Sequence, residues 1–303
     1  MNSTLQPIPW AALALVFNSL VWGLSWWPFR QLEGQGLHPL WATVWVYLPT
    51  VVVIAAVRPR AVMQLLRDRS LWVLMLAAGA TNAAFNWATV IGDVVRVVLL
   101  FYLMPLWSVL LARCLLKESL SAVAGIRMVL ALVGAAIVLA APDAGGVPGL
   151  PLPQSLADWL GLLGGFAFAL NNVMLKRTAD RPEEGRVLAM FVGGAMVAAL
   201  LGAALSAHGD IAWPLTAGGE PWPWWLPVLV LTLSALFLCS NLALQFGAVR
   251  LPVHVSSVLM LSEVLFAAVS AVLLGAGHVT GSLLAGGALI VLTAAWAARE
   301  PAH

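Results

Sequence analysis

Long apolar segments recur along almost the whole chain and restrict its fold more than any other feature. A helix needs about 20 apolar residues to cross the hydrocarbon core of a bilayer. Hydrophobic residues make up 62% of the 303 residues and charged residues 9%, whereas ordinary soluble domains carry roughly 25% charged residues. A water-soluble fold of this length could not bury so much apolar surface. The sequence therefore predicts an all-α integral membrane protein with ten transmembrane helices, at residues 9–29, 39–57, 71–91, 94–116, 122–141, 156–175, 187–207, 224–247, 253–274 and 279–298.

The basic residues fall unevenly on the two sides of the membrane that these spans define. Of the fifteen lysine and arginine residues, only Arg30 and Arg96 lie on the second side. Cytoplasmic loops carry the excess of basic residues in membrane proteins, so we expect both termini to be cytoplasmic. The basic residues form no stripe that would bind nucleic acid, and Cys114 and Cys239 are too few for a disulfide framework.

Residues 80–118 and 240–276 resemble each other and indicate an internal repeat. With five spans in each copy, the second copy would enter the membrane in the opposite orientation. Such inverted repeats are typical of secondary transporters, whose substrate site lies near the centre of the membrane between the copies. We expect the first repeat at residues 1–142, a Pro/Gly-rich linker at 143–155 and the second repeat at 156–303. The matching residues are Asn82, Asn86 and Trp87 in the first copy and Asn241, Gln245 and Phe246 in the second.

The sequence contains none of the motifs that would indicate a familiar class of enzyme. No His-Glu-x-x-His metal site, Gly-x-Ser-x-Gly nucleophile, phosphate-binding loop or paired-cysteine motif occurs. We therefore expect a protein that is not an enzyme, with no catalytic residues, no metal and no cofactor.

Glu263 lies near the middle of the ninth predicted span and is the most deeply placed acidic residue of the chain. Ionisable side chains inside a membrane are costly, so they face the protein interior or a water-filled cavity. One interpretation is a binding site for a proton or an amine. The other is a neutral or hydrogen-bonded glutamate that links the ninth helix to the amide of a neighbour, and the sequence does not decide between them.

Amides and aromatic residues inside the spans are the other candidates for a substrate cavity. Asn82, Asn86 and Asn171 can bind a zwitterion or hydrogen-bond neighbouring helices, whereas packing is the simpler interpretation for Asn241 and Gln245. Tryptophan rings that face a cavity would offer stacking and cation–π surfaces. The residues predicted to line the cavity are Trp22, Ser25, Asn82, Asn86, Tyr102, Asn171, Ser257 and Glu263.

Gly23, Pro28 and Pro105 are predicted to let their helices bend during gating. Pro105 is expected in the middle of the fourth span, where it would leave one backbone carbonyl without its helical donor. Glycines of the tenth span, such as Gly286 and Gly287, allow close helix packing. A homodimer through that span is one interpretation, but packing within a single chain is simpler, so we expect a monomer.

Several of these features together resemble the EamA-type drug/metabolite transporter superfamily. They are Trp22-Gly23 in the first span, Pro105 in the fourth, Leu116-Lys117-Glu118 after it, and the duplicated five-span pattern over essentially the whole chain. The resemblance implies two inverted halves around a central cavity, alternating access, and a location in the bacterial inner membrane. Ala276 stands where such proteins often have a glutamate, which weakens any role assigned to that position by symmetry.

The resemblance also implies export of amino acids, in particular aromatic ones and related amphipathic metabolites. An exporter of drugs or cationic compounds from the same superfamily is an alternative. A membrane scaffold or receptor without transport is an alternative from another class, although the short loops offer little surface for protein partners. The expected partners are a small-molecule substrate and the lipid bilayer, with no nucleic acid. Coupling to protons through Glu263 and downhill transport both stay open.

Overall fold

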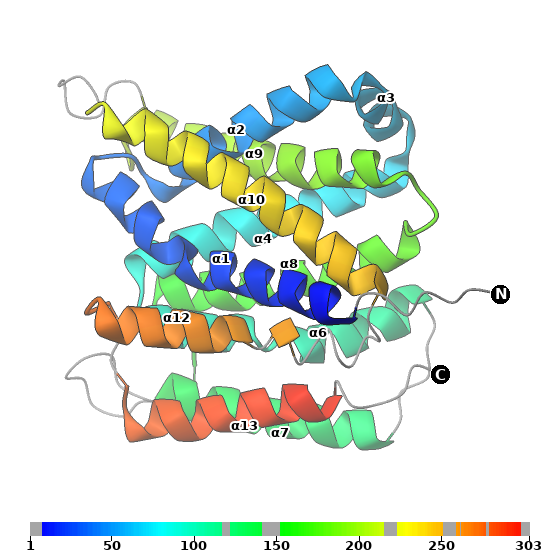
Figure 1. The fold of residues 1–303 in the computed structure, drawn as a ribbon. Helices are drawn as coiled ribbons and strands as arrows, with labels where there is room; N and C mark the ends of the chain where they lie inside the picture. The colour runs from blue at the N-terminus through cyan, green and yellow to red at the C-terminus, as the bar shows by residue number, and fades with distance from the viewer. Residues whose placement is uncertain are drawn as a thin grey trace.

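Helices make up all the regular structure in the residues that the computed structural model describes, which are 8–116, 122–140, 152–214, 223–250, 259–260, 262–276 and 279–297 (Figure 1). Six of the described helices are long and apolar enough to cross a membrane: α1, α2, α4, α8, α9 and α10. The apolar stretches of α7, α12 and α13 are shorter. The predicted all-helical membrane protein with several spans is therefore confirmed. The elements are α1 (Ile8–Gly34), α2 (Pro39–Val57), α3 (Pro59–Arg67), α4 (Arg69–Ile91), α5 (Val94–Phe101), α6 (Met104–Leu111), the π-helical turn η1 (Ala112–Leu116), α7 (Ala122–Ala140), α8 (Leu156–Arg177), α9 (Glu183–His208), α10 (Trp225–Arg250), α12 (Ser262–Leu273) and α13 (Gly281–Ala297).

The predicted fourth span, residues 94–116, is not one continuous α-helix. It consists of α5, α6 and η1, with Tyr102 and Leu103 as turn residues between α5 and α6. At this break the N–H of Leu103 donates to the carbonyl of Leu100, three residues back (3.2 Å). Pro105 is the second residue of α6, so its missing N–H falls in the first turn, where backbone donors have no helical partner. The expectation that Pro105 interrupts the middle of a helix is therefore wrong.

A short amphipathic helix, α3, lies between the second and third predicted spans, where the sequence predicted no span. Ala61 and Leu65 on one side of α3 are buried, and α3 packs against α9. Met63 and Leu66 on the other side are exposed. A helix with this division of side chains is suited to the surface of a membrane rather than to its interior.

Asp68 separates α3 from α4 and caps the N-terminus of α4. Its Oδ1 accepts hydrogen bonds from the hydroxyl of Ser70 (2.6 Å) and from the N–H of the same residue (2.9 Å). The guanidinium of Arg181 lies 2.9 Å from the second carboxylate oxygen. The hydroxyl bond, the backbone bond and Arg181 together hold the pKa of Asp68 below its ordinary value. This cap fixes the point at which the chain re-enters the helical bundle.

The long helices are arranged in two groups. In one group α4 packs against α8 and α9, and in the other α1 packs against α10 and α12. Figure 1 shows α1, α10 and α12 in front of α4, α8 and α9. A third pair, α7 and α13, runs side by side along one edge of the molecule (Figure 1). Each group therefore combines helices from early and late parts of the chain.

Glycine allows two of these helix crossings to be very close. A Cβ atom on Gly79 of α4 would collide with the carbonyl of Gly193 of α9, and a Cβ atom on Gly193 would collide with the carbonyl of Met75. In the second group, a Cβ atom on Gly23 of α1 would lie 2.9 Å from the carbonyl oxygen of Glu263 in α12. The neighbours are backbone atoms that have no rotamers to adjust, so these crossings require glycine.

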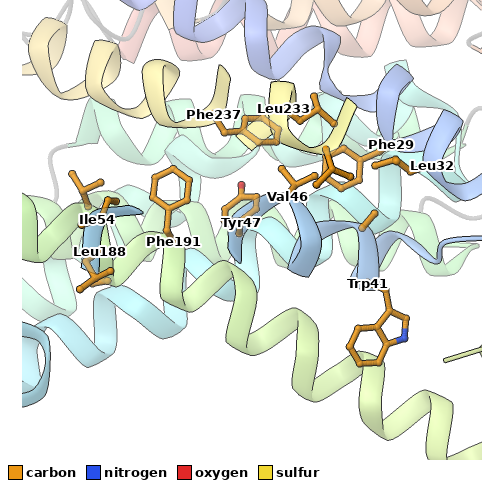
Figure 2. Close-up of a cluster of buried hydrophobic side chains, with 14 of the residues drawn as sticks. Phe29, Leu32, Trp41, Val46, Tyr47, Ile54, Leu188, Phe191, Leu233 and Phe237 are labelled. Carbon is orange, nitrogen blue, oxygen red and sulfur yellow. The ribbon is translucent and has the colours of Figure 1, made fainter. Parts of the chain in front are cut away.

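A large buried cluster of aromatic and aliphatic side chains joins α2 to α9 and α10 (Figure 2). Tyr47 of α2 lies beside Phe191 of α9 and Phe237 of α10, with ring centroids 5.3 and 5.7 Å away. Packed aromatic rings bury a large apolar area and prefer such tilted arrangements. The phenol group of Tyr47 reaches from this cluster toward the space between the two helix groups.

Candidate functional site

A pocket lies between the two helix groups. Its cavity volume is about 60 Å³, which is smaller than the roughly 300–1,000 Å³ of typical small-molecule sites, so the space between the two groups is narrow in this conformation. Side chains of α1, α10 and α12 form one wall and side chains of α4, α8 and α9 form the other, with Tyr47 of α2 and Phe101 of α5 between them. Most of the lining is apolar. Its polar members are Asn18, Tyr47, Thr81, Asn82, Asn171, Asn241 and Glu263.

Glu263 contributes the carboxyl group of the pocket. It lies in α12 (Ser262–Leu273), and only 6% of its surface is exposed. The hydroxyl of Tyr102 lies 2.9 Å from both Oε2 of Glu263 and the carbonyl oxygen of Met260, so it donates its single proton to one of them at a time. The sequence predicted this glutamate near the middle of a span; in the described part of the chain, residues 259–260 before it and Ser262–Leu273 around it are helical.

Asn82 of α4 and Asn171 of α8 both line the pocket, from the same wall. Oδ1 of Asn82 accepts a hydrogen bond from the hydroxyl of Tyr47 (3.0 Å). Asn171 is 1% exposed, and its Nδ2 makes one long bond of 3.5 Å to Asn172. Oδ1 of Asn171 is buried without a hydrogen-bond partner. A buried polar atom of this kind is expensive unless a ligand or water satisfies it.

Of the other residues predicted for the cavity, the described structure places only Trp22 in the pocket lining. Trp22 does line the pocket, but the hydroxyl of Ser25 donates to the carbonyl of Trp22 within α1 (2.7 Å) and is absent from the lining. Nδ2 of Asn86 donates to the hydroxyl of Thr43 in α2 (3.0 Å), so Asn86 links two helices. Tyr102 stands behind Glu263 rather than in the lining. Ser257 lies outside the described residues.

Two amides of the lining were not among the residues predicted for it. Asn18 of α1 accepts a hydrogen bond from the hydroxyl of Ser240 in α10 (2.8 Å). Asn241, for which packing was the simpler interpretation, also lines the pocket and accepts a bond from Nε2 of Gln245 (2.9 Å). Both are amides inside predicted spans, the first and the eighth, and this was the signal that could have pointed to them. In the described part of the chain, no group of three or more His, Cys, Asp and Glu side chains is arranged to hold a metal ion.

Aromatic rings supply much of the apolar surface of the pocket. Trp22 of α1 stacks on Phe237 of α10, with centroids 4.8 Å apart. Phe101 of α5 contacts Phe85 of α4 (4.9 Å) and Phe168 of α8 (5.4 Å). These rings come from both walls, so a ligand in the pocket would meet ring faces and edges on opposite sides.

The predicted hinge residues of α1 lie within an unbroken helix. α1 runs from Ile8 to Gly34 through both Gly23 and Pro28. Gly23 lies at the close crossing with α12, so in this conformation it serves helix contact. The bending of α1 at these positions stays a prediction.

A buried ion pair closes the end of the molecule at which α5 and α8 begin. Nε and Nη2 of Arg96 donate to the two carboxylate oxygens of Asp158 at 2.7 and 2.8 Å, and Nη1 donates to the carbonyl of Val138 at the end of α7 (3.0 Å). Arg30 of α1 binds the carbonyls of Thr89 and Gly92 at the same end. Bidentate guanidinium–carboxylate bonds are among the strongest hydrogen bonds in proteins. These bonds join α5 to α7 and α8, and α1 to the end of α4, beyond the pocket.

Residues 9–140 match the model of the EamA-like transporter family. This match supports an assignment to the drug/metabolite transporter superfamily and indicates a multi-pass membrane transporter rather than an enzyme. No curated protein matches the chain in sequence. Among solved structures, a crystal structure of a protein that is 18% identical has a similar fold, with a TM-score of 0.60 over 95% of each chain.

Proposed function

We propose that the protein exports amino acids, in particular aromatic ones and related amphipathic metabolites, across the bacterial inner membrane by alternating access. The observation that carries the proposal is the composition of the pocket. Aromatic rings from both walls surround a small set of amides and one carboxyl group. An aromatic side chain would stack on the rings, while its ammonium group would bind Glu263 and the free Oδ1 of Asn171.

The pattern of helix contacts supports ten spans in two inverted halves. If α1, α2, α4, α5 with α6, and α7 correspond to α8, α9, α10, α12 and α13, the largest contacts between the two halves have symmetric counterparts, whereas several contacts within the first half have none among the described residues of the second. The contact of α4 with α8 corresponds to that of α10 with α1, and the contact of α5 with α8 corresponds to that of α12 with α1. α7 and α13, like α2 and α9, contact each other directly. A twofold axis in the membrane plane would produce this pattern.

The distribution of basic residues supports cytoplasmic termini. Figure 1 places α3, the first turn of α1 and the last turns of α10 and α13 at one end of the molecule. α3 brings Arg60 and Arg67 to that end, whereas Arg96 and Arg30 bind at the other. A cytoplasmic surface is normally the more basic one. Since one chain supplies both walls of the pocket, we expect the protein to act as a monomer.

The resemblance of the sequence to the aromatic amino acid exporter YddG adds to the argument for the substrate. A second candidate is the export of amphipathic cations. The described residues that line the pocket include one carboxyl group and no lysine or arginine, and aromatic rings attract cations as well as aromatic side chains.

Counterflow into proteoliposomes tests both candidates. Vesicles that contain the purified protein are loaded with unlabelled tryptophan, phenylalanine, leucine or a cationic dye, and uptake of labelled tryptophan is followed. We expect aromatic amino acids to drive counterflow best. Counterflow driven by the dye alone would replace the proposed substrate with a cation. No flux of any compound through protein that retains its fold would remove the transporter proposal.

A further inference from the structure

A second hollow lies next to the pocket, at the end where α1 and α9 begin and α10 ends. We name it the vestibule, and its lining residues are Ala14, Glu183, Arg186, Leu242, Ala243, Gln245 and Phe246. These residues come from α1, α9 and α10 only. All three helices also line the pocket, so the two spaces share walls.

The vestibule and the pocket are one helical turn apart. Ala14 precedes the pocket residue Asn18 by four positions on α1, and Arg186 precedes Met190 by four positions on α9. Four residues of helix correspond to about 6 Å along the axis. On α10, Nε2 of Gln245 in the vestibule donates to Oδ1 of Asn241 in the pocket (2.9 Å). A solute that reached the pocket from this end would pass the vestibule first.

Arg186 is the cation of the vestibule, and its binding capacity is unused. Its Nε is buried and has no hydrogen-bond partner. Other guanidinium groups of the chain bind carboxylates or carbonyls, as Arg96 and Arg30 do. Glu183, three positions before Arg186, also lines the vestibule, but the two form no ion pair in the described structure. Glu184 accepts a bond from Gln64 of α3 instead (3.5 Å). A buried donor without a partner is costly, and a carboxylate is the group that a guanidinium fork fits best.

We propose that the vestibule is a docking site at which Arg186 binds the carboxylate of an amphipathic substrate before the substrate enters the pocket. The proposal rests on the proposed function, and it adds a site that precedes the pocket. The two charged groups of an amino acid would then be recognised at two different sites. The carboxylate is selected by Arg186 in the vestibule, and the ammonium is bound by Glu263 and Asn171 in the pocket.

The test compares transport of tryptophan with transport of tryptophan amide, which keeps the ring and the amine and lacks the carboxylate. In Arg186→Gln we expect kcat/KM for tryptophan to fall about tenfold and kcat/KM for the amide to stay within about twofold. Arg186→Lys, which keeps the charge, should retain most of the activity. Arg60→Gln is the matched control, because it removes an exposed cation from α3 at the same end and should change neither rate.

An equal loss for both compounds, or no loss for tryptophan, would overturn the docking site. The vesicles are made first with zwitterionic and then with anionic phospholipids. An effect of Arg186→Gln that occurs only with anionic lipids would mean that Arg186 binds a lipid phosphate, which also overturns the proposal. If Arg186→Gln does not fold, Arg186→Met, which is apolar and of similar length, takes its place.

Binding separates this proposal from the proposed function. If the wild-type protein carries no tryptophan, the proposed function fails, and equilibrium binding of labelled tryptophan in detergent tests Arg186 directly. Weaker binding by Arg186→Gln than by wild type, with unchanged binding of the amide, would support the docking site. Absent or equal binding of tryptophan would overturn it.

Discussion

Asp158 and Glu263 are both buried acidic residues in membrane helices, but their surroundings differ. Asp158 is 1% exposed and accepts two bonds from the guanidinium of Arg96, together with one from the N–H of Gln154 (2.9 Å). Glu263 is 6% exposed and, among the described residues, has one hydrogen-bond donor, the hydroxyl of Tyr102. No cation of the described chain lies beside it in the pocket.

The difference separates a structural carboxylate from one that is available to a ligand. Every bond that Asp158 needs is supplied by the protein, so this residue contributes to a fixed contact between α5, α7 and α8. Glu263 lies at the edge of an open space with capacity to accept further bonds. Burial and charge alone do not distinguish the two, since only their partners do. The following predictions test this distinction, from the largest expected effect to the smallest.

Arg96→Gln should be the most destabilising of these changes. It would leave the carboxylate of Asp158 buried without its cation, which costs about 3–5 kcal/mol in the free energy of unfolding. Thermal and denaturant unfolding in detergent measure the loss. Arg181→Gln is the control, because its ion pair with Asp68 is exposed on the arginine side and is worth about 0–1 kcal/mol. An equal effect of the two changes would show that the buried pair is not a structural contact.

Glu263→Gln should lower transport and leave the stability of the fold almost unchanged, the opposite of Arg96→Gln. It keeps the size of the side chain and removes its charge, so we expect tryptophan transport to fall about 10- to 100-fold through the loss of a charged hydrogen bond. Unfolding should change little, because the protein supplies no cation for this carboxylate. Counterflow and thermal unfolding are measured on the same preparation. A large loss of stability with normal transport per folded molecule would place Glu263 with Asp158 as a structural residue.

Asn171→Ala and Asn86→Ala extend the distinction to amides. Asn171 has an unpartnered Oδ1 at the pocket, so its removal should lower kcat/KM for tryptophan by about 3- to 10-fold with little change in stability. Asn86 bonds Thr43 across two helices, so its removal should cost about 1 kcal/mol of stability. Both substitutions remove the same atoms from α4 or α8. If Asn171→Ala lowered stability and Asn86→Ala lowered transport, the assignment of the pocket lining would be wrong.

His38 should give the smallest effect, visible as a dependence of stability on pH. Burial lowers the pKa of His38 from 6.5 to about 4, and its Nδ1 accepts a bond from the N–H of Leu40 at the start of α2 (3.3 Å). Below pH 6.5 the unfolded chain takes up a proton that the folded chain refuses until about pH 4. Stability should therefore be complete above pH 6.5 and fall gradually as the pH drops toward 4, by only about 0.2–0.3 kcal/mol for each pH unit, because solvent screens this partly exposed imidazole.

His38→Asn separates this contribution from that of other groups, because asparagine also caps helices and does not titrate. The difference in unfolding free energy between wild type and variant should be constant above pH 6.5 and change between pH 6.5 and pH 4. A difference that does not depend on pH would show that His38 is already protonated, or free to be protonated, in the folded protein.

The sequence predicted the membrane helices and the residues of the pocket more successfully than it predicted the orientation of individual side chains. Glu263, Asn82 and Asn171 are far apart in the chain and meet at one pocket, because polar groups inside spans must face the interior. Whether a polar side chain faces a cavity or a neighbour depends on the rotation of its helix about its own axis. That rotation comes from contacts such as the one at Gly23, which the local sequence does not contain.

Two features of the backbone were also not predicted. The break at Tyr102 and Leu103 lies in an apolar run, and its signal is Pro105, which was interpreted as a mid-helix proline rather than as the start of a new helix. The helix α3 is short and carries a mixture of arginines and apolar residues, which reads as a basic loop when only span-length windows are considered. Such a helix becomes visible only when periodicity over a few residues is taken into account.

The crossing of Gly79 and Gly193 has a consequence for how such a transporter would move. It joins α4, from the first predicted repeat, to α9, from the second, with backbone against backbone and no side chain that could slide or adopt another rotamer. A swing of one repeat as a rigid body against the other would separate these two glycines. The parts that change places would instead be mixed units, α4 with α8 and α9 as a stationary base and α1 with α10 and α12 as the moving arm. The boundary between repeats in the gene would then not be a mechanical boundary in the protein.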